Sequence, residues 1–509
     1  MNLHRDILRL AVPSILANIT VPLVGMVDIA VAGHLGASGG AGAAALIGGI
    51  SIGTMLFDML YWNFGFLRGG TGGLTAQAYG RFHAGDGDAA GDISITLKRA
   101  LGIAFGSGLA LVALQWVVVQ VAFLLVKCSY EVQTLATQYF YIRIWAAPAT
   151  LSLFAFKGWF IGMQDTVRPM ICDLLVNALN ILLSIGLAFG YACLPALGFK
   201  GIAFGTLIAQ WAGFTYASLA VWRRYGTFFI HEHGGGNEKR LKRSLSDAPA
   251  RDGEQKEAET CPEPCCGTEE GAQGHQNAFP AATDRGWRAF FVLNRDLFLR
   301  SVCMIAVYIG FTMISARYGD MMLAVGTIMM KLLMIFSYFT DGFAYAGEAL
   351  TGRFIGERSH EGVRSTIRQT FVWSLGVTVL FLLVYSVGGV PLLRLMTSDA
   401  SVVEAGREYL PWLLLMPVIG CPAFTWDGIF TGATASKDLR NSTAWCVVGF
   451  FTVWYIGAWL GEAFNSGSLG LEGLLPGTAI HILMAAYFTH LLIRALYLTL
   501  RWRKAIPFA

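Results

Sequence analysis

Charged residues are scarce in this chain. Asp, Glu, Lys and Arg make up only 14% of the 509 residues, while apolar residues make up 55%. An average soluble domain carries about 25% charged residues, because its surface faces water. The shortage therefore excludes a large soluble enzyme and a disordered chain, and it favours a polytopic membrane protein. The net charge of +4 is too small to indicate a nucleic-acid-binding surface, so we expect no nucleic-acid partner.

Two further features are missing from the sequence. No glycine-rich loop ends in Lys-Ser or Lys-Thr, which excludes an ATP-driven motor of the Walker type. The nine cysteines have no spacing that indicates a disulfide framework. Cys172, Cys193, Cys303, Cys421 and Cys446 lie in apolar segments, where we expect them to be small buried side chains.

Long apolar runs are abundant. A bilayer core needs about 20 apolar residues per helix. Twelve runs meet this length, and they are roughly 10–34, 44–67, 99–126, 134–162, 169–193, 199–222, 297–317, 321–345, 371–390, 409–433, 443–460 and 474–498. With both termini in the cytoplasm, about 15 basic residues fall in short inner segments and about 5 in outer ones. We therefore expect a multi-pass protein of the plasma (inner) membrane with both termini cytoplasmic.

Residues 227–286 break the apolar pattern. They are rich in Pro, Glu, Gly and Ser, and they contain the basic run 239–243 and the cysteines 261, 265 and 266. Such a composition cannot bury a core, so we predict a disordered cytoplasmic linker with a basic membrane-surface anchor. The predicted organisation is a six-helix lobe at 1–226, this linker at 227–286, and a second six-helix lobe at 287–509.

The two predicted lobes repeat each other in sequence. Residues 5–8 (RDIL) correspond to 295–298 (RDLF), and 159–162 (WFIG) correspond to 429–432 (IFTG). Six spans per half is an even number, so both halves enter the membrane in the same direction. The pattern predicts an all-α integral membrane protein of twelve transmembrane helices in two pseudo-symmetric lobes, whose rocking would give alternating access.

Several motifs resemble those of the multidrug and toxic compound extrusion (MATE) family. They are 27–28 (VD) with 33–36 (GHLG), 66–77 (FLRGGTGGLTAQ), 162–166 (GMQDT), 177–181 (NALNI) and 341–346 (DGFAYA). The second and last of these are most similar to the DinF-like branch. The resemblance covers essentially all twelve spans but not residues 227–286.

The resemblance implies export of small organic, often cationic, compounds driven by inward flow of Na⁺ or H⁺. It also implies a coupling site in the first lobe, around an Asp in the first span and polar residues in the fifth and sixth, one of which matches Thr206. Many family members carry a second carboxylate where this chain has Ser184, so the implied site holds one acid here.

Asp28 is the first candidate for this chemistry. An ionised carboxylate at membrane depth costs roughly 2.5–3.5 kcal/mol on insertion scales, so it persists where it has a partner, a proton or a cation. Pro22 lies six residues earlier and removes a backbone donor, which suggests a hinge in the same helix.

A polar stripe on the fifth span is the second candidate. Asp173, Asn177, Asn180 and Ser184 are spaced by four, three and four residues, which places them on one helical face. Counting from the outer ends of the spans puts Asp28, Asn180, Ser184 and Thr206 at one depth. Their oxygens suit Na⁺, with Asp28 and Asn180 as ligands, or hydrogen bonds to a protonated Asp28. The alternative is that the stripe only joins helices.

Other intramembrane acids are secondary candidates. Asp341 and Asp427 look deep enough to line a cavity or pair with a base, whereas Glu348 lies near a predicted helix end where water can solvate it. The mid-membrane charges are mostly acidic, which argues against the strongly basic cavity that a flippase would need. Tyr61 and Tyr139 are candidate ring contacts for a lipophilic cation, although core packing explains such residues equally well.

The sequence thus predicts a secondary active antiporter rather than an enzyme. We expect it to need no cofactor, to use H⁺ or Na⁺ as the coupling ion, and to act as a monomer on a small organic substrate in the lipid bilayer. A flippase of lipid-linked saccharides or a carboxylate exporter is the alternative within transport. A membrane-embedded enzyme is more remote, and the two-lobe repeat disfavours a channel.

Overall fold

The described part of the chain folds almost entirely into helices. The computed structural model of the protein describes residues 2–37, 42–125, 129–191, 194–230, 287–396, 400–466 and 476–507, and no strand occurs in these ranges. The first lobe contains α1 (Leu3–Ala37), α2 (Ala43–Trp62), α3 (Gly65–His83), α4 (Ala89–Ala113), α5 (Gln115–Leu125), α6 (Tyr130–Arg143), α7 (Ala147–Gly162), α8 (Val167–Phe189) and α9 (Phe199–Ile230). The second contains α11 (Trp287–Arg317), α12 (Asp320–Gly356), α13 (His360–Met396), α14 (Ala400–Arg407), α15 (Leu410–Gly432), α16 (Ser436–Ser466) and α17 (Pro476–Ala505).

Some predicted spans consist of two helices in series. The second span is α2 followed by α3, the third is α4 followed by α5, and the fourth is α6 and α7 joined by a 3₁₀ turn at Ile144–Ala146. Eleven segments in the described ranges are long and apolar enough to cross a membrane. The helix α9 is not among them, because Gln, Trp, Thr and Tyr side chains lower its hydropathy. It has 32 residues, and at roughly 1.5 Å per residue it exceeds the bilayer core of about 30 Å.

The helix α9 also revises one predicted boundary. It continues to Ile230, so the first four residues of the predicted linker, 227–230, are helical. The rest of that linker, with its basic run and three cysteines, lies outside the described residues, and so does Cys193. Cys172, Cys421 and Cys446 are buried as predicted, while Cys303 is half-buried.

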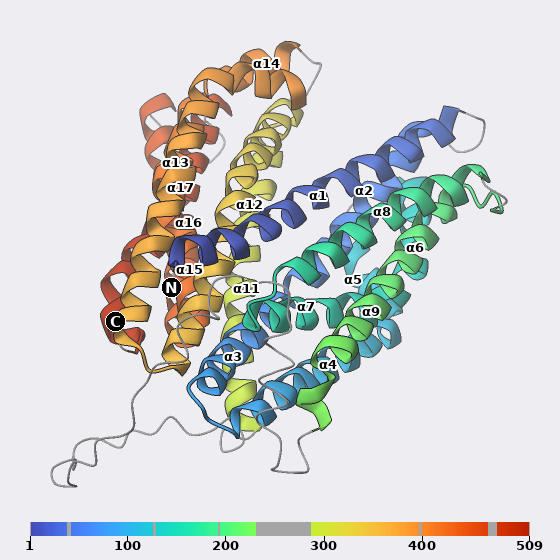
Figure 1. The fold of residues 1–509 in the computed structure, drawn as a ribbon. Coiled ribbons are helices and arrows are strands. Elements are labelled where there is room, and N and C mark those ends of the chain that lie inside the picture. Colours follow the sequence, from blue (N-terminus) through green and yellow to red (C-terminus); the bar gives the residue numbers. More distant parts are fainter. Residues whose placement is uncertain are drawn as a thin grey trace, which may run out of the picture.

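Helix packing repeats between the two halves (Figure 1). In the first lobe α8 packs on α9, α3 on α7, and α1 on α8. In the second lobe α16 packs on α17, α12 on α15, and α11 on α16. The molecule is therefore an all-α membrane protein of about twelve spans in two pseudo-symmetric lobes, as the sequence repeat predicts.

Glycines at matching positions set the closest helix contacts. Gly158 of α7 lies so close to α3 that a Cβ atom there would overlap the carbonyl oxygen of Arg68. In the second lobe, a Cβ atom at Gly428 would overlap the carbonyl oxygen of Ala344, and one at Gly432 that of Glu348. Small residues spaced by four allow two backbones to approach within the membrane. The same glycine-mediated helix contact thus occurs once in each lobe, between α7 and α3 and between α15 and α12.

The helices α7 and α15 also end in the same way. Gln164 and Thr434 follow them with φ of 58° and 55°, in the left-handed region. Each turn is closed by a backbone N–H that reaches back five residues, from Asp165 to Phe160 O at 2.9 Å and from Ala435 to Phe430 O at 3.0 Å. This is the helix-ending turn of the Schellman type. It supports the correspondence of residues 159–162 with 429–432.

The lobes meet closely at one end of the molecule. A Cβ atom at Gly80 of α3 would overlap the backbone of Arg353 on α12. The side-chain amide of Gln77 donates across the interface to Gly432 O at 3.0 Å and to Thr434 Oγ1 at 3.2 Å. Towards the opposite end, which carries α14 and the last turns of α1, the helices of the two lobes diverge (Figure 1).

Candidate functional site

Asp28 lies on α1 inside the first lobe and is only 4% exposed. Its carboxylate interacts with the hydroxyl of Ser184 on α8 and with the guanidinium of Arg143. Its Oδ1 atom is buried and has no hydrogen-bond partner in the described part of the chain. A buried acceptor without a donor costs free energy, so this oxygen marks a place where a proton or a cation can bind.

The neighbouring turn of α8 carries a second unpaired oxygen. The side-chain amide of Asn180 donates to Thr206 Oγ1 on α9 at 2.8 Å, and that hydroxyl donates to Ile202 O at 3.3 Å. These bonds orient the Asn180 amide and leave its Oδ1 buried without a partner among the described residues. The structure thus brings together Asp28, Asn180, Ser184 and Thr206, the four residues that were placed at one depth from the sequence.

Asn177 sits one turn away from this cluster. Its amide donates to Thr20 Oγ1 at 2.7 Å and so ties α8 to α1 close to Pro22. Pro22 itself is exposed, and α1 remains one continuous helix through it. The hinge at Pro22 stays a prediction.

Arg143 is a neighbour of Asp28 that the sequence reasoning missed. It ends α6, donates to Tyr139 Oη at 2.8 Å, and places its guanidinium 4.7 Å from the ring centre of Phe57. It also acts electrostatically on both Asp28 and Asp58. The signal was available, because a basic residue inside a predicted span needs an anionic partner.

The two candidate tyrosines contribute mainly to packing. Tyr139 is fully buried, fills the space beside Gly53 and accepts the hydrogen bond from Arg143. Tyr61 packs against Phe57 with ring centres 5.4 Å apart. Tyr139 therefore positions Arg143, and its ring has no open face for a substrate cation.

Asp173 does not belong to the Asp28 cluster. It lies on α8 near the end of the helix where the lobes meet, and its carboxylate accepts from Lys157 Nζ at 2.7 Å. Although it shares a face with Asn177 and Asn180, it is eleven residues from Ser184 and has its own cation. The predicted stripe therefore divides into Asp173, which has an ion-pair partner, and the uncharged residues Asn177, Asn180 and Ser184 further along α8.

Asp427 is neutralised by two arginines that the sequence reasoning also missed. Arg300 Nη2 lies 2.6 Å from its Oδ2, and Arg494 contacts both carboxylate oxygens. Arg494 is almost completely buried. Because two guanidinium groups face one carboxylate, their combined positive charge disfavours the binding of a further cation at Asp427.

Glu348 corrects the prediction that it is solvated at a helix end. It is completely buried, and its Oε2 accepts from Arg68 Nη1 at 3.0 Å across the lobe interface. The contact of α3 with α12 covers it, which the position within the helix alone does not reveal. Asp341 lies nearby on α12, half-buried, within the field of Arg68 and Asp427.

The basic neighbours also change the overall charge of the interior. When these bases are included, the spans contain as many basic as acidic residues. This corrects the expectation that the mid-membrane charges are mostly acidic. The acids are Asp28, Asp58, Asp173, Asp341, Glu348 and Asp427, and the bases are Arg68, Arg143, Lys157, Arg300, Lys331 and Arg494. No group of three or more His, Cys, Asp or Glu residues that could hold a metal occurs in the described ranges.

Two repeated lobes of membrane-spanning helices, with a buried acid and its unpaired oxygen inside the first, indicate a class of protein, the two-lobed membrane transporters. The MatE family profile matches residues 13–185 and 297–454. The chain is 31% identical to DNA damage-inducible protein F of Escherichia coli over 497 residues, which cover 97% of this chain and 91% of the relative. The chain belongs to the MatE family of multidrug and toxic compound efflux transporters, whose members are not enzymes.

Other relatives agree with this assignment. The probable multidrug resistance protein NorM of Thermotoga maritima is 22% identical over 470 residues, covering 90% of this chain and 89% of that protein. The bent form of the Vibrio cholerae MATE transporter VcmN superposes with a TM-score of 0.71 at 16% identity, covering 99% and 97% of the two chains. A MOP superfamily transporter of Pyrococcus furiosus, described as having a binding pocket of reversed polarity, gives a TM-score of 0.65 at 17% identity with 99% and 97% coverage. These structures share the fold.

Proposed function

We propose that this protein is an H⁺-coupled antiporter that exports small organic compounds by alternating access, with Asp28 as the coupling residue. The observation that carries the proposal is the pair of buried, unpaired oxygens, Asp28 Oδ1 and Asn180 Oδ1, in one cluster of the first lobe. Glu348, Asp173 and Asp427, in contrast, each have a basic side chain within 3.0 Å of a carboxylate oxygen.

The neighbours of Asp28 favour a proton over Na⁺. A proton bound to Asp28 turns an acceptor into a donor, and Asn180 Oδ1 is an acceptor in the same cluster that needs one. Arg143 stands beside the carboxylate and would repel a metal cation bound there, whereas it stabilises the ionised carboxylate after the proton leaves. Na⁺ coupling through the same oxygens is the alternative.

The proposed transport cycle uses these residues as follows. A proton that enters from outside neutralises Asp28 and weakens its attraction to Arg143. The helix α1 then repacks against α8 near Pro22 and Asn180, and the substrate leaves outward. The lobes then close and reopen toward the cytoplasm, where Asp28 releases the proton. In this proposal both termini are cytoplasmic, and the monomer is the working unit in the inner membrane.

The test is transport by purified protein in proteoliposomes, with a pH gradient and a Na⁺ gradient imposed separately. We expect efflux of a fluorescent organic cation under the pH gradient alone, and its loss in Asp28→Asn at unchanged expression and unfolding temperature. Asp173→Asn is the matched control, because that acid has its own lysine. Efflux driven only by Na⁺ would move the proposal to the alternative ion, and full activity of Asp28→Asn would refute it.

The basic residues support export of a carboxylate as the second candidate function. The side chains of Arg68, Lys157 and Arg300 are each about one-fifth exposed, and an anionic substrate would be attracted to their positive charge. A flippase of lipid-linked saccharides would use the same charges. Competition of the dye efflux by organic anions, and not by organic cations, would favour this candidate.

A further inference from the structure

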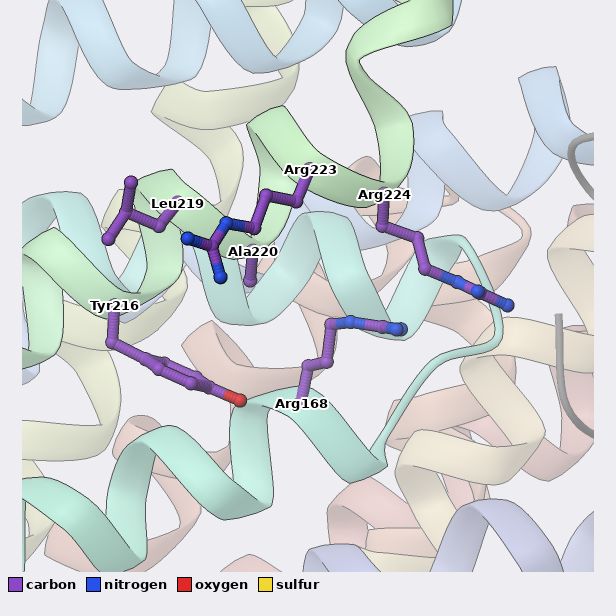
Figure 2. A pocket seen from close by; sticks show the side chains of 6 residues that line it. All are labelled: Arg168, Tyr216, Leu219, Ala220, Arg223 and Arg224. Atoms are coloured by element: carbon purple, nitrogen blue, oxygen red, sulfur yellow. The ribbon is translucent and has the colours of Figure 1, made fainter.

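A pocket lies far from the Asp28 cluster, at the end of the molecule where the lobes meet. It encloses about 430 Å³ between the start of α8 and the last turns of α9. Its lining consists of Arg168, Tyr216, Leu219, Ala220, Arg223 and Arg224. Figure 2 shows Arg168 facing the side chains of α9, with the hydroxyl of Tyr216 pointing toward it. Three arginines and one phenol hydroxyl thus border one hollow.

The pocket has a surplus of positive charge. Arg168 of the lining pairs with Asp165, whose carboxylate also accepts from the hydroxyl of Tyr225 at 2.7 Å. Arg224 interacts with the hydroxyl of Tyr225, and Arg223 has no acidic partner among the residues that the structure describes. Three guanidinium groups against one carboxylate leave a formal charge of +2 at the pocket.

The adjoining surface of α9 carries exposed apolar side chains. Leu219 is 48% exposed and Trp222 is 80% exposed, and both lie within one turn of Arg223 on α9. An exposed Trp followed by arginines is typical of the level where hydrocarbon meets headgroups. The pocket therefore lies at that boundary, with cations on the headgroup side and apolar side chains on the acyl-chain side.

We propose that this pocket binds the phosphate of an anionic phospholipid. Arginine recognises phosphate oxygens through two parallel N–H donors, and the Tyr216 hydroxyl supplies a further donor. Basic pockets between transmembrane helices are suited to anionic headgroups. An acyl chain would lie along Leu219 and past Trp222, a contact that free phosphate cannot use. The site is independent of the proposed antiport.

The test measures lipid binding to the full-length protein in detergent by native mass spectrometry. The probes are phosphatidylglycerol and phosphatidylcholine of equal acyl composition. We expect Arg223→Gln with Arg224→Gln to lower the retention of phosphatidylglycerol relative to phosphatidylcholine by about thirtyfold, since each of the two basic residues contributes about 1 kcal/mol near an anionic surface. Ala220→Phe, which fills the pocket and keeps its charge, is expected to act in the same direction.

The matched control is Arg364→Gln with Arg368→Gln, two exposed arginines of α13 that carry the same charge change. Equal losses in the control and the test variant would overturn the proposal, and so would unchanged retention in both pocket variants. Adding inorganic phosphate at millimolar concentration distinguishes a site for a lipid headgroup from a site for free phosphate. We expect it to leave phosphatidylglycerol bound, and complete displacement would assign a free-anion site in place of a lipid site.

Discussion

Arg68 Nη1 lies 3.0 Å from Glu348 Oε2, and this ion pair joins α3 of the first lobe to α12 of the second. Glu348 occupies the space beside Gly72, where a Cβ atom would overlap its Oε1. The guanidinium of Arg68 also stacks 4.4 Å from the ring centre of Tyr345. A rocking motion that opens this end of the molecule must separate or rearrange these groups.

Replacing Glu348 by Gln should therefore weaken the closed interface. The neutral amide fits the same volume but loses the charge interaction with Arg68, and a buried charge without its partner is destabilising. We expect a shift toward forms open at this end, seen as wider distances between spin labels on α3 and α12, and roughly tenfold slower transport. Glu357→Gln is the control, because Glu357 pairs within its own helix with Arg353. An unchanged distance distribution in Glu348→Gln would contradict the assignment.

The unpaired oxygen of Asn180 makes a separate prediction. Asn180→Leu keeps the side-chain volume but removes both the acceptor and the donor to Thr206. We expect transport to fall by about tenfold or more, since one well-placed polar group is worth about 1–3 kcal/mol, while the protein still folds. Asn177→Leu removes only the bond to Thr20 and is expected to retain more activity. Equal losses in the two variants would argue that both residues only join helices.

Asp427 should matter for stability more than for coupling. Asp427→Asn leaves Arg300 and Arg494 facing each other without an anion, and breaking a buried pair typically costs about 3–5 kcal/mol. We expect a clearly lower unfolding temperature in detergent and partial recovery in the double variant Asp427→Asn, Arg300→Gln. Asp438→Asn, whose partner Arg501 is half exposed, should change the free energy of unfolding by less than about 1 kcal/mol.

The glycine contacts give a purely steric prediction. Gly158→Ala places a methyl group against the backbone oxygen of Arg68, which must move away. We expect destabilisation of about 1–3 kcal/mol, the usual cost of overpacking, measured as a lower unfolding temperature. Gly102→Ala on α4 is the control, because nothing lies within 4 Å of its added Cβ atom. That variant should be neutral or more stable, since Ala favours helix.

The sequence predicted the membrane spans and the cluster around Asp28 well. It did not predict which basic residue pairs with each intramembrane acid. The lengths of the apolar runs located the spans. The helical spacing of the polar residues, and their distance from the ends of the spans, were enough to group Asp28 with Asn180. The partners of an intramembrane charge depend on tertiary packing, so Arg143 and Arg494 were missed. The prediction for Glu348 was wrong for the same reason, since Arg68 is 280 residues away in the chain and only lobe contact buries the carboxylate.

The repeat has a consequence for how the two lobes associate. Each lobe forms its own helix pairs, and the contacts between the lobes come mainly from α1 and α3 of the first lobe and from α11, α12 and α15 of the second. Apart from α11 on α3, these contacts are made by helices remote from Ile230 and Trp287, between which the chain passes from one lobe to the other. In physical terms the two lobes resemble the subunits of a heterodimer that share one chain. The connection then acts by raising the effective concentration of one lobe near the other. Two separately synthesised halves, ending and beginning in that connection, should therefore find each other in the same membrane.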